Sequence, residues 1–275
     1  MRMKKVDRAV KEMIELKKRH GFFAFRLGGS YTPSKYLRRL ANQLIESQAN
    51  IEFSGYGRIS DAEKDDFELL YRAGCRSLFF GVESGNQMIL DKTNKGYQTA
   101  HSAAILKASK KAGIFTITSL VFPNPGETEE SRKETLRLIK EVKPDGVPVL
   151  FPLLSPGSRW WAEPEKYGFQ VPDRDDYLHK TVGYKARLVY PPRFWPEMPY
   201  RIDNKPFKQF TVESEEFTRE IEEMGPVTRI SDEIALLGLR SGLEIREFGN
   251  YYRWCFVTGD SVEMQRLVDN INRAA

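Results

Sequence analysis

Residues 77–96 read Ser77-Leu-Phe-Phe-Gly-Val-Glu-Ser-Gly-Asn-Gln-Met-Ile-Leu-Asp-Lys-Thr-Asn-Lys-Gly96, and they are the most informative segment about the fold. Its first half, Ser77 to Val82, is an apolar run between turn signals, which predicts a buried strand. The strand ends in Glu83 and Ser84, a carboxylate and a hydroxyl at the point where the chain turns. Ligands of parallel α/β sheets bind at the carboxyl ends of the strands. Glu83 is therefore a candidate binding carboxylate.

Strand-like segments recur on both sides of this stretch, at a spacing of roughly 30 residues. A helical pattern separates each of these segments from the next, and the segments end near residues 27, 54, 83, 121 and 153. Such a βα repeat predicts an α/β fold with a parallel sheet and right-handed crossovers. An open doubly wound sheet and a partial barrel fit this periodicity equally well.

The capping signals and apolar stripes give the helices their limits. Ser60-Asp61-Ala62-Glu63 predicts a capping box for the third helix, and Thr128 is the expected N-cap of a helix that runs to Val142. Past residue 158 the βα pattern stops, so we expect a core over 1–158 and a small α+β appendage over 159–275. Within the appendage we expect three helices, at 214–224, 231–242 and 261–274, with Ser214 as the N-cap of the first. We expect one or two short strands between the last two helices, at 246–258.

Composition narrows the function classes. The chain has 275 residues, 40% of them apolar, and two cysteines far apart in the sequence. No apolar run approaches the ~18 residues that a membrane helix needs, and the charged first 20 residues do not resemble a signal peptide. We therefore expect no membrane association, a reducing compartment and a cytoplasmic location.

The net charge of +5 is confined to one segment. Residues 1–20 hold eight Lys or Arg against three Asp or Glu, so the rest of the chain is neutral. A solvated helix face and a contact with RNA or another anionic partner both fit this excess. No basic motif with interleaved aromatic residues accompanies it, so nucleic acid is not an expected partner.

A family resemblance rests on four segments in a fixed order. They are Ala73-Gly74-Cys75, Gly81-Val-Glu-Ser-Gly-Asn-Gln-Met-Ile-Leu-Asp-Lys-Thr-Asn-Lys-Gly96, Ala112-Gly113-Ile114 and Pro125-Gly126-Glu127-Thr128. Together they resemble the radical S-adenosylmethionine (radical SAM) superfamily over residues 6 to 170, most closely its cobalamin-binding-domain and methylthiotransferase-like branches. The resemblance implies a partial (β/α)6 TIM-like barrel. Because the chain begins with a helix and supplies five strands, we expect the first strand of that barrel to be missing.

The resemblance also implies a [4Fe-4S] cluster held by a CxxxCxxC motif, and this motif is absent. Cys75 and Cys255 have no such spacing and are expected to be small buried residues. The three histidines show no metal-ligand spacing. We therefore assign no catalytic and no metal-binding residue in this chain, and expect a cluster only if its cysteines lie outside the chain.

Two explanations of the missing motif stay open. The chain is either a truncated piece of a longer enzyme, with cobalamin bound elsewhere in the parent protein, or a degenerate relative without a cluster. In both cases the missing strand leaves an open sheet edge, and such edges pair readily. A strand-donating upstream segment or partner protein is therefore expected.

Three strand ends carry the residues that the resemblance assigns to the cofactor's polar groups. Gly28-Gly29-Ser30 matches the family's Gly-Gly-Glu element, which meets the cofactor's ammonium; Ser30 replaces the acid, and a plain glycine-rich turn is the alternative. Glu83 matches a carboxylate that binds the ribose hydroxyls, with Ser84 as its companion; an ion pair with a nearby Lys or Arg is the alternative. Arg58 could hold a carboxylate or form a surface ion pair.

The last two strands would border the adenine. The resemblance assigns this role to the strand that contains Thr118 and to apolar residues from Leu150 onward, although both could be plain core. Family members often continue with Gly-Leu-Pro-Gly-Glu-Thr, whereas this chain reads Pro123-Asn124-Pro125-Gly126-Glu127-Thr128. The first two positions therefore depart from the family pattern.

These observations predict a portion of a radical SAM enzyme that binds S-adenosylmethionine for the radical-based modification of an unknown substrate. We expect the isolated chain to be inactive. The alternative is a cluster-less module that binds a nucleotide-like ligand or a protein. An ordinary hydrolase or aldolase is disfavoured, because the chain has no Gly-x-Ser-x-Gly elbow, no metal-spaced histidines and no lysine at a strand end.

Overall fold

A five-stranded parallel sheet is the centre of the computed structural model, which describes residues 3–182 and 196–273. The strands follow chain order across the sheet. They are β1 (Ala24–Leu27), β2 (Glu52–Gly57), β3 (Cys75–Glu83), β4 (Phe115–Val121) and β5 (Val149–Leu150). The predicted parallel α/β sheet is confirmed, and among the described residues β1 lies at one edge of it and β5 at the other.

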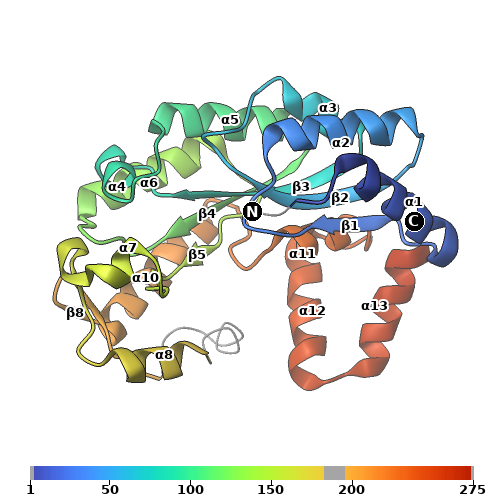
Figure 1. Cartoon of the computed structure of the whole chain (residues 1–275). Coiled ribbons are helices and arrows are strands. Elements are labelled where there is room, and N and C mark those ends of the chain that lie inside the picture. The colour runs from blue at the N-terminus through green and yellow to red at the C-terminus, as the bar shows by residue number, and fades with distance from the viewer. Residues whose placement is uncertain (1–2, 183–195, 274–275) are drawn as a thin grey trace.

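Six helices connect or precede these strands. They are α1 (Val6–His20), α2 (Ser34–Glu46), α3 (Asp66–Arg72), α4 (Gln87–Lys92), α5 (Thr99–Lys111) and α6 (Glu129–Val142). Figure 1 shows α2, α3, α5 and α6 along one face of the sheet. Their apolar stripes and the outward face of the strands form the main core, with Leu40, Phe53, Leu78, Phe80 and Leu106 almost fully buried. Burial of these stripes is the main stabilising contribution to this layer.

The remaining chain folds back against both ends of the sheet. Its elements are α7 (Arg159–Ala162), the 3₁₀ helix η1 (Pro164–Tyr167), β6 (Phe169–Gln170), α8 (Arg174–Val182), β7 (Arg201–Ile202), β8 (Lys205–Pro206), α10 (Phe207–Glu223), α11 (Asp232–Gly238), α12 (Ile245–Thr258) and α13 (Ser261–Arg273). The strands β6, β7 and β8 form a small antiparallel sheet. Among the described helices, none has the length and hydropathy needed to cross a membrane.

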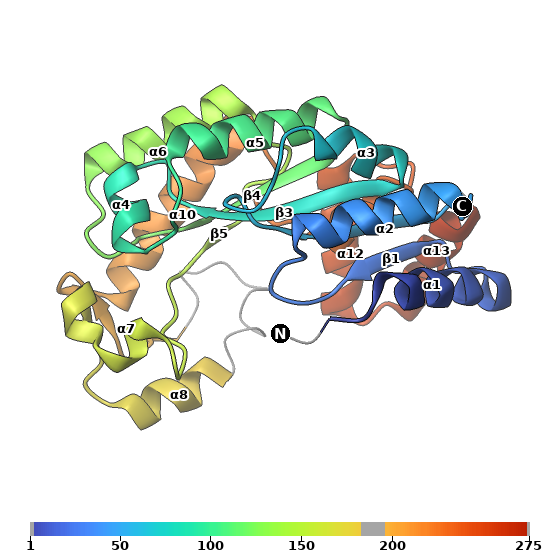
Figure 2. The same cartoon turned by 45° about the horizontal axis from the view of Figure 1, so that its top comes forward.

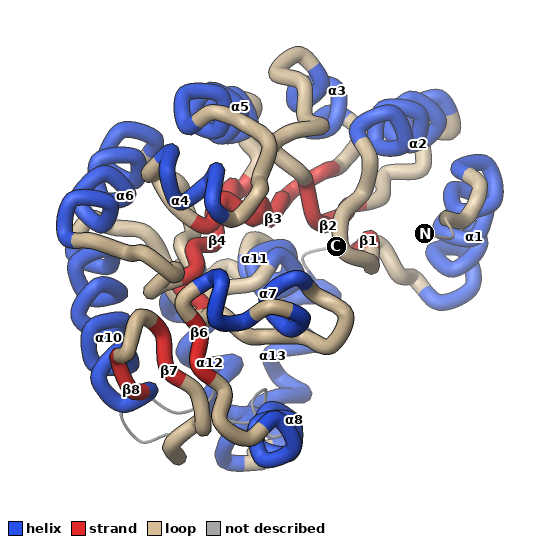
Figure 3. Tube along the Cα trace, turned by 60° about the vertical axis from the view of Figure 1, so that its left-hand side comes forward, coloured by secondary structure: helices blue, strands red, loops and turns tan. Residues whose placement is uncertain are grey.

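Helix α11 lies on the concave side of the sheet, opposite the helices that follow the strands (Figure 3). Its first residue, Asp232, has a side chain with no exposed surface. The Arg26 guanidinium donates to both oxygens of this carboxylate, at 2.9 and 3.0 Å, and the Ser54 hydroxyl donates at 2.9 Å. Burial acts to raise the pKa of Asp232, but the hydrogen bonds with Arg26, Glu233 and Ser54 and the charge of Arg26 together outweigh it, and the pKa lies below its ordinary value.

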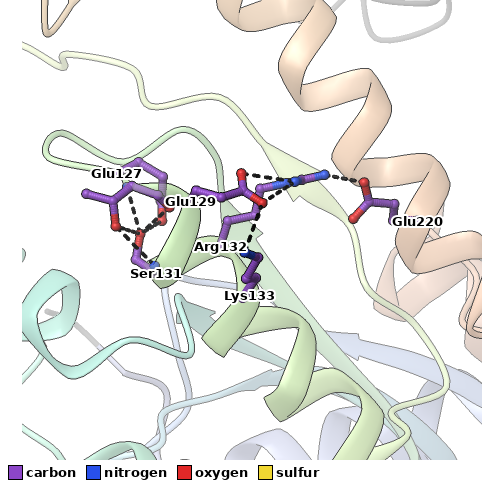
Figure 4. Close-up of polar contacts among 7 residues, drawn as sticks. Glu127, Glu129, Ser131, Arg132, Lys133 and Glu220 are labelled. Atoms are coloured by element: carbon purple, nitrogen blue, oxygen red, sulfur yellow. Dashed lines mark hydrogen bonds and ion pairs between the residues drawn. The ribbon is translucent and has the colours of Figure 1, made fainter.

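Helix α10 packs against the part of the sheet that contains β4 and β5. The ring of Phe217 stacks on Phe122, just after β4, with 4.4 Å between the ring centroids. Figure 4 shows Arg132 of α6 between Glu129 and Glu220, so an ion pair joins α6 to α10. The C-terminal part thus contacts the sheet in two places, through α10 beside β4 and β5 and through α11 on the concave face.

Three expectations about helix limits are wrong. The segment Ser60–Glu63 does not cap α3, which begins at Asp66; the Asp61 carboxylate instead accepts a hydrogen bond from the Ser34 amide at 2.7 Å. Ser214 is buried within α10 and does not begin it, because the apolar stripe extends back to Phe207. The strands expected over 246–258 are helix α12, whose aromatic residues pack against α11 and α13; tertiary packing overrides their strand propensity.

We predict that Asp232→Asn lowers the free energy of unfolding by about 2 kcal/mol. Breaking a fully buried ion pair costs about 3–5 kcal/mol, and the lower figure allows for Arg26, whose side chain is 37% exposed. Urea unfolding followed by circular dichroism measures the change.

The matched control is Asp175→Asn, an exposed position in the first turn of α8. It should change stability by less than about 0.5 kcal/mol. An Asp232→Asn protein as stable as this control would show that the Arg26 contact does not hold α11 against the sheet.

Candidate functional site

All five strands end at one edge of the sheet, which we call the carboxyl edge. Helix α4, which directly follows β3, marks this edge in Figure 2. Most of the sequence-predicted residues lie along it: the ends of β1, β2, β3 and β5 carry 28–30, Arg58, Glu83 with Ser84, and Leu150. Neighbouring strands are about 4.8 Å apart, so the edge from β1 to β5 spans about 19 Å.

Glu83 has an unusual backbone conformation at the centre of this edge. Its φ is +73°, in the left-handed region, which costs a residue with a side chain roughly 1–2 kcal/mol. The pairing of β3 with β4 is also irregular between Gly81 and Glu83. Such irregularities bend a strand and redirect a side chain, and they are frequent beside active sites. The structure therefore directs the Glu83 carboxylate away from a regular strand position.

The Glu83 carboxylate forms one ion pair. Its Oε1 accepts a hydrogen bond from Lys95 Nζ at 2.7 Å, so the ion-pair alternative from the sequence is realised. Among the described residues, Oε2 accepts no hydrogen bond, and the side chain is 20% exposed. A Cβ atom on Gly81 would lie 2.9 Å from Oε1, so the glycine leaves the space that the carboxylate occupies. One carboxylate oxygen is available to a ligand.

Tyr97 supports the same strand end from the segment before α5. Its hydroxyl donates to the carbonyl of Val82 at 3.0 Å. Burial raises the pKa of Tyr97 and the Glu83 charge raises it further, while the positive charge of Arg58 opposes both. The phenol therefore stays protonated and keeps its hydrogen bond.

Ser84 points toward α6 instead of the open edge. It is 1% exposed, and its hydroxyl lies 3.2 Å from Thr135 Oγ1 and accepts the amide of Asn86 at 3.1 Å. The next residue, Gly85, is in tight contact with the same helix, since a Cβ there would lie 2.6 Å from the Cα of Thr135. These contacts fix the β3–α4 turn on α6.

The end of β1 is open. Gly28, Gly29 and Ser30 are exposed, and a Cβ atom on either glycine would meet nothing within 4 Å. Arg58 is exposed too and stacks on the ring of Tyr31 at 5.4 Å, with no ion pair among the described residues. This space leaves room for a ligand, and it is equally what a plain glycine-rich turn would show.

Thr118 and Leu150 have different surroundings. Thr118 is fully buried on the sheet face that also carries Thr116, whose hydroxyl meets Ser109 of α5 at 2.8 Å. Because side chains alternate along a strand, Thr118 faces the helices, and only its backbone could border a ligand. Leu150 is 39% exposed at the end of β5, where an apolar ring could rest on it.

Sequence reasoning missed Asn124 as a member of this site. Asn124 is 1% exposed, and its side-chain amide donates to the carbonyl of Val121 at 2.7 Å and to that of Glu83 at 3.4 Å. The Glu127 carboxylate accepts a hydrogen bond from the Asn124 backbone amide at 3.2 Å. Burial raises the pKa of Glu127 above its ordinary value. In the sequence, the departure from the family motif at Asn124 was the feature that could have drawn attention to this residue.

The described residues do not fit an iron–sulfur cluster. Cys75 lies in the main core, where burial raises the pKa of its thiol, and Cys255 is buried in α12. Thiolates are the ligands of such clusters, and a buried protonated thiol is a poor one. Within residues 3–182 and 196–273, no three His, Cys, Asp or Glu side chains form a group that could hold a metal ion.

A family model for the radical SAM superfamily matches residues 1–139, half of the chain. The chain belongs to the radical SAM superfamily. The predicted family is thus confirmed, although this radical SAM chain lacks the CxxxCxxC motif.

Sequence relatives agree with the predicted branch. An uncharacterised methyltransferase of Pyrococcus horikoshii is 24% identical over 57% of this chain and 34% of its own length. A tRNA-2-methylthio-N(6)-dimethylallyladenosine synthase of Clostridium botulinum is 26% identical over 68% of this chain and 40% of its own length. The chain therefore spans between a third and two fifths of these relatives, and the likeness to methylthiotransferases is confirmed.

A solved structure shares the fold. The radical S-adenosylmethionine methyltransferase TsrM of Kitasatospora setae, determined with cobalamin and a [4Fe-4S] cluster bound, matches 97% of this chain and 56% of its own chain. The TM-score is 0.63 and the sequence identity is 13%. At this identity the comparison supports the radical SAM fold alone.

We predict that Glu127→Gln changes the pH dependence of stability. The folded state raises the Glu127 pKa, so folding favours the protonated acid. This contribution stabilises the protein as pH falls through the folded pKa and is lost as pH rises. A neutral Gln removes the dependence, so the stability gain of the variant over the wild type should grow as pH rises from the ordinary glutamate pKa through the raised folded pKa, and should then level off.

Thermal unfolding at a series of pH values measures this gain. Glu130→Gln, an exposed position in the first turn of α6 just after Glu127, is the control and should follow the wild type. A constant difference between Glu127→Gln and the wild type across the series would contradict a raised pKa.

Proposed function

We propose that the carboxyl edge binds the adenosyl group of S-adenosylmethionine and that Glu83 accepts hydrogen bonds from the ribose hydroxyls. The observation that carries this proposal is the geometry of Glu83. It lies at the end of the central strand, has a left-handed backbone, and offers one carboxylate oxygen beside the Lys95 ion pair. An ionised acceptor forms hydrogen bonds about twice as strong as a neutral one.

The other edge residues take the remaining parts of the cofactor. Arg58, exposed and without an ion pair among the described residues, would hold the methionine carboxylate, for which a guanidinium is well shaped. The open turn at 28–30 would let the backbone approach the ammonium group, with Ser30 as a neutral acceptor. Leu150 would rest on the adenine, and Thr118 would contribute backbone only.

We further infer that this chain is the cofactor-positioning portion of a radical SAM enzyme whose [4Fe-4S] cluster is ligated by residues outside it. The two buried cysteines leave this chain without cluster ligands, and the match to the two curated relatives covers only 34% and 40% of their own length. The role of the described residues is to bind and orient the adenosyl group. Cobalamin, which the TsrM structure contains, would belong to a further part of the parent protein.

The free edge of β1 is where the cluster-bearing segment would attach. Among the described residues β1 pairs with β2 alone. Its outer backbone groups can therefore accept a parallel strand from an upstream segment or from a partner protein. Such a strand would end at the carboxyl edge, next to Gly28 and Gly29.

A cluster-less binding module is the second candidate. The absence of cluster ligands favours it, and it would use the same edge to hold a nucleotide-like ligand without reaction. Both candidates require adenosyl binding at Glu83, and they differ in whether iron can be loaded.

We predict that Glu83→Gln weakens binding of S-adenosylmethionine by about ten- to a hundredfold. A hydrogen bond to a charged group contributes about 1.5–3 kcal/mol, which corresponds to this range. Isothermal titration calorimetry on the iron-free chain measures the affinity.

The matched control is Glu141→Gln, an exposed position on α6 away from the carboxyl edge, which should bind like the wild type. The melting temperature of each variant shows whether the protein remains folded. Equal affinities for Glu83→Gln and the control would remove Glu83 from the site.

We predict that the chain alone binds no [4Fe-4S] cluster under anaerobic reconstitution with iron and sulfide. Co-expression with a segment that carries CxxxCxxC should restore iron binding and should slow hydrogen exchange of the β1 amides. Colorimetric iron analysis and exchange mass spectrometry are the measurements. Stoichiometric iron on the chain alone would contradict the proposed division of the site, and restored iron with unprotected β1 amides would contradict strand addition.

A further inference from the structure

The turn after β4 holds a polar side chain that contacts two strand ends at once. Asn124 Nδ2 donates to the carbonyl of Val121 at 2.7 Å, at the end of β4, and to that of Glu83 at 3.4 Å, at the end of β3. The side chain is almost fully buried, with 1% exposure of the residue. Asn124 therefore bridges the two strands at the position where the Glu83 backbone leaves the regular ladder.

The Glu83 backbone needs such a contact. A left-handed residue with a side chain persists only where its surroundings determine it. At Glu83 the Lys95 ammonium holds the carboxylate and the Asn124 amide holds the carbonyl. The direction of the side chain is thus fixed at both ends of the residue.

The segment that leads into α6 orients Asn124 in turn. Glu127 Oε2 accepts the Asn124 backbone amide at 3.2 Å and lies 3.4 Å from its Nδ2. The Ser131 hydroxyl donates to the other oxygen of Glu127, and Figure 4 shows these two residues side by side at the start of α6. Ser131 is itself buried and forms the capping box with Thr128. A continuous set of hydrogen bonds therefore leads from the helix terminus to the carbonyl of Glu83.

Stability alone does not account for this asparagine. Its Oδ1 is buried and has no hydrogen-bond partner among the described residues, and such an orphan costs about 1–3 kcal/mol. An apolar side chain of the same size would avoid this cost but could not bridge the strand ends. The feature that the site uses is the hydrogen-bond donor of the Asn124 side-chain amide.

We propose that Asn124 is a positioning residue that makes the carboxyl edge selective for ligands with ribose hydroxyls, because it fixes the direction of the Glu83 carboxylate. This inference rests on the proposed ribose contact of Glu83 and extends it to a residue that touches no ligand. Without the Asn124 amide, the Glu83 carbonyl loses a side-chain donor and the Glu83 side chain loses its fixed direction. The affinity for the ribose hydroxyls then falls, while contacts to the base are unchanged.

The test compares adenosine with 2′,3′-dideoxyadenosine, two ligands that differ only in the hydroxyls. Calorimetric affinities of the iron-free chain are measured for the wild type and for Asn124→Leu and Asn124→Asp. The leucine keeps the volume, and the aspartate keeps the shape without the donor. Asn270→Leu, an exposed position on α13, is the matched control.

We expect the wild type and the control to prefer adenosine by at least about tenfold. Both Asn124 variants should reduce this preference to about twofold or less, with the affinity for dideoxyadenosine within about twofold of the wild type. A general structural defect would lower both affinities equally. Either folded variant with the wild-type preference would overturn the proposal for Asn124, whereas a wild type without any preference would overturn the ribose contact of Glu83 itself.

Discussion

Parallel pairing of β3 with both of its neighbours is the constraint on which the rest of the structure depends. It brings the ends of successive strands to one edge, so residues far apart in the sequence, such as Ser30 and Glu83, share a surface. It also places the outer helices on one face and leaves the concave face to α11. The Arg26–Asp232 contact then holds the C-terminal part against that face. The binding proposed for the carboxyl edge therefore depends on a backbone arrangement that every layer of the protein supports.

Much of this arrangement could be predicted from the sequence, because it follows from local patterns. The apolar run from Ser77 to Val82 and the cap at Thr128 specify β3 and the start of α6 without reference to the rest of the chain. The helix α4 was missed although Asn86 caps it through the amide of Ile89. Helix α12 was mistaken for strands, since its aromatic residues favour strands by propensity and only contacts with α11 and α13 make them helical.

The candidate site could likewise be predicted from the sequence only in part. Glu83 could be assigned from its place after a buried strand, but its left-handed backbone and its partner Lys95 are properties of the folded chain. Asn124 and Tyr97 were not predicted, because their roles depend on carbonyl groups of neighbouring segments. The absence of the cluster motif was visible in the sequence alone, and the burial of both cysteines in the structure agrees with it.

The central claim is that the carboxyl edge of this radical SAM chain receives an adenosyl group at Glu83. A crystal structure of the iron-free chain with S-adenosylmethionine tests it most directly. The account predicts ligand density across the strand ends, with the ribose hydroxyls within hydrogen-bond distance of the Glu83 carboxylate and the adenine near Leu150. Density at another surface, or a bound ribose that does not contact Glu83, would contradict it.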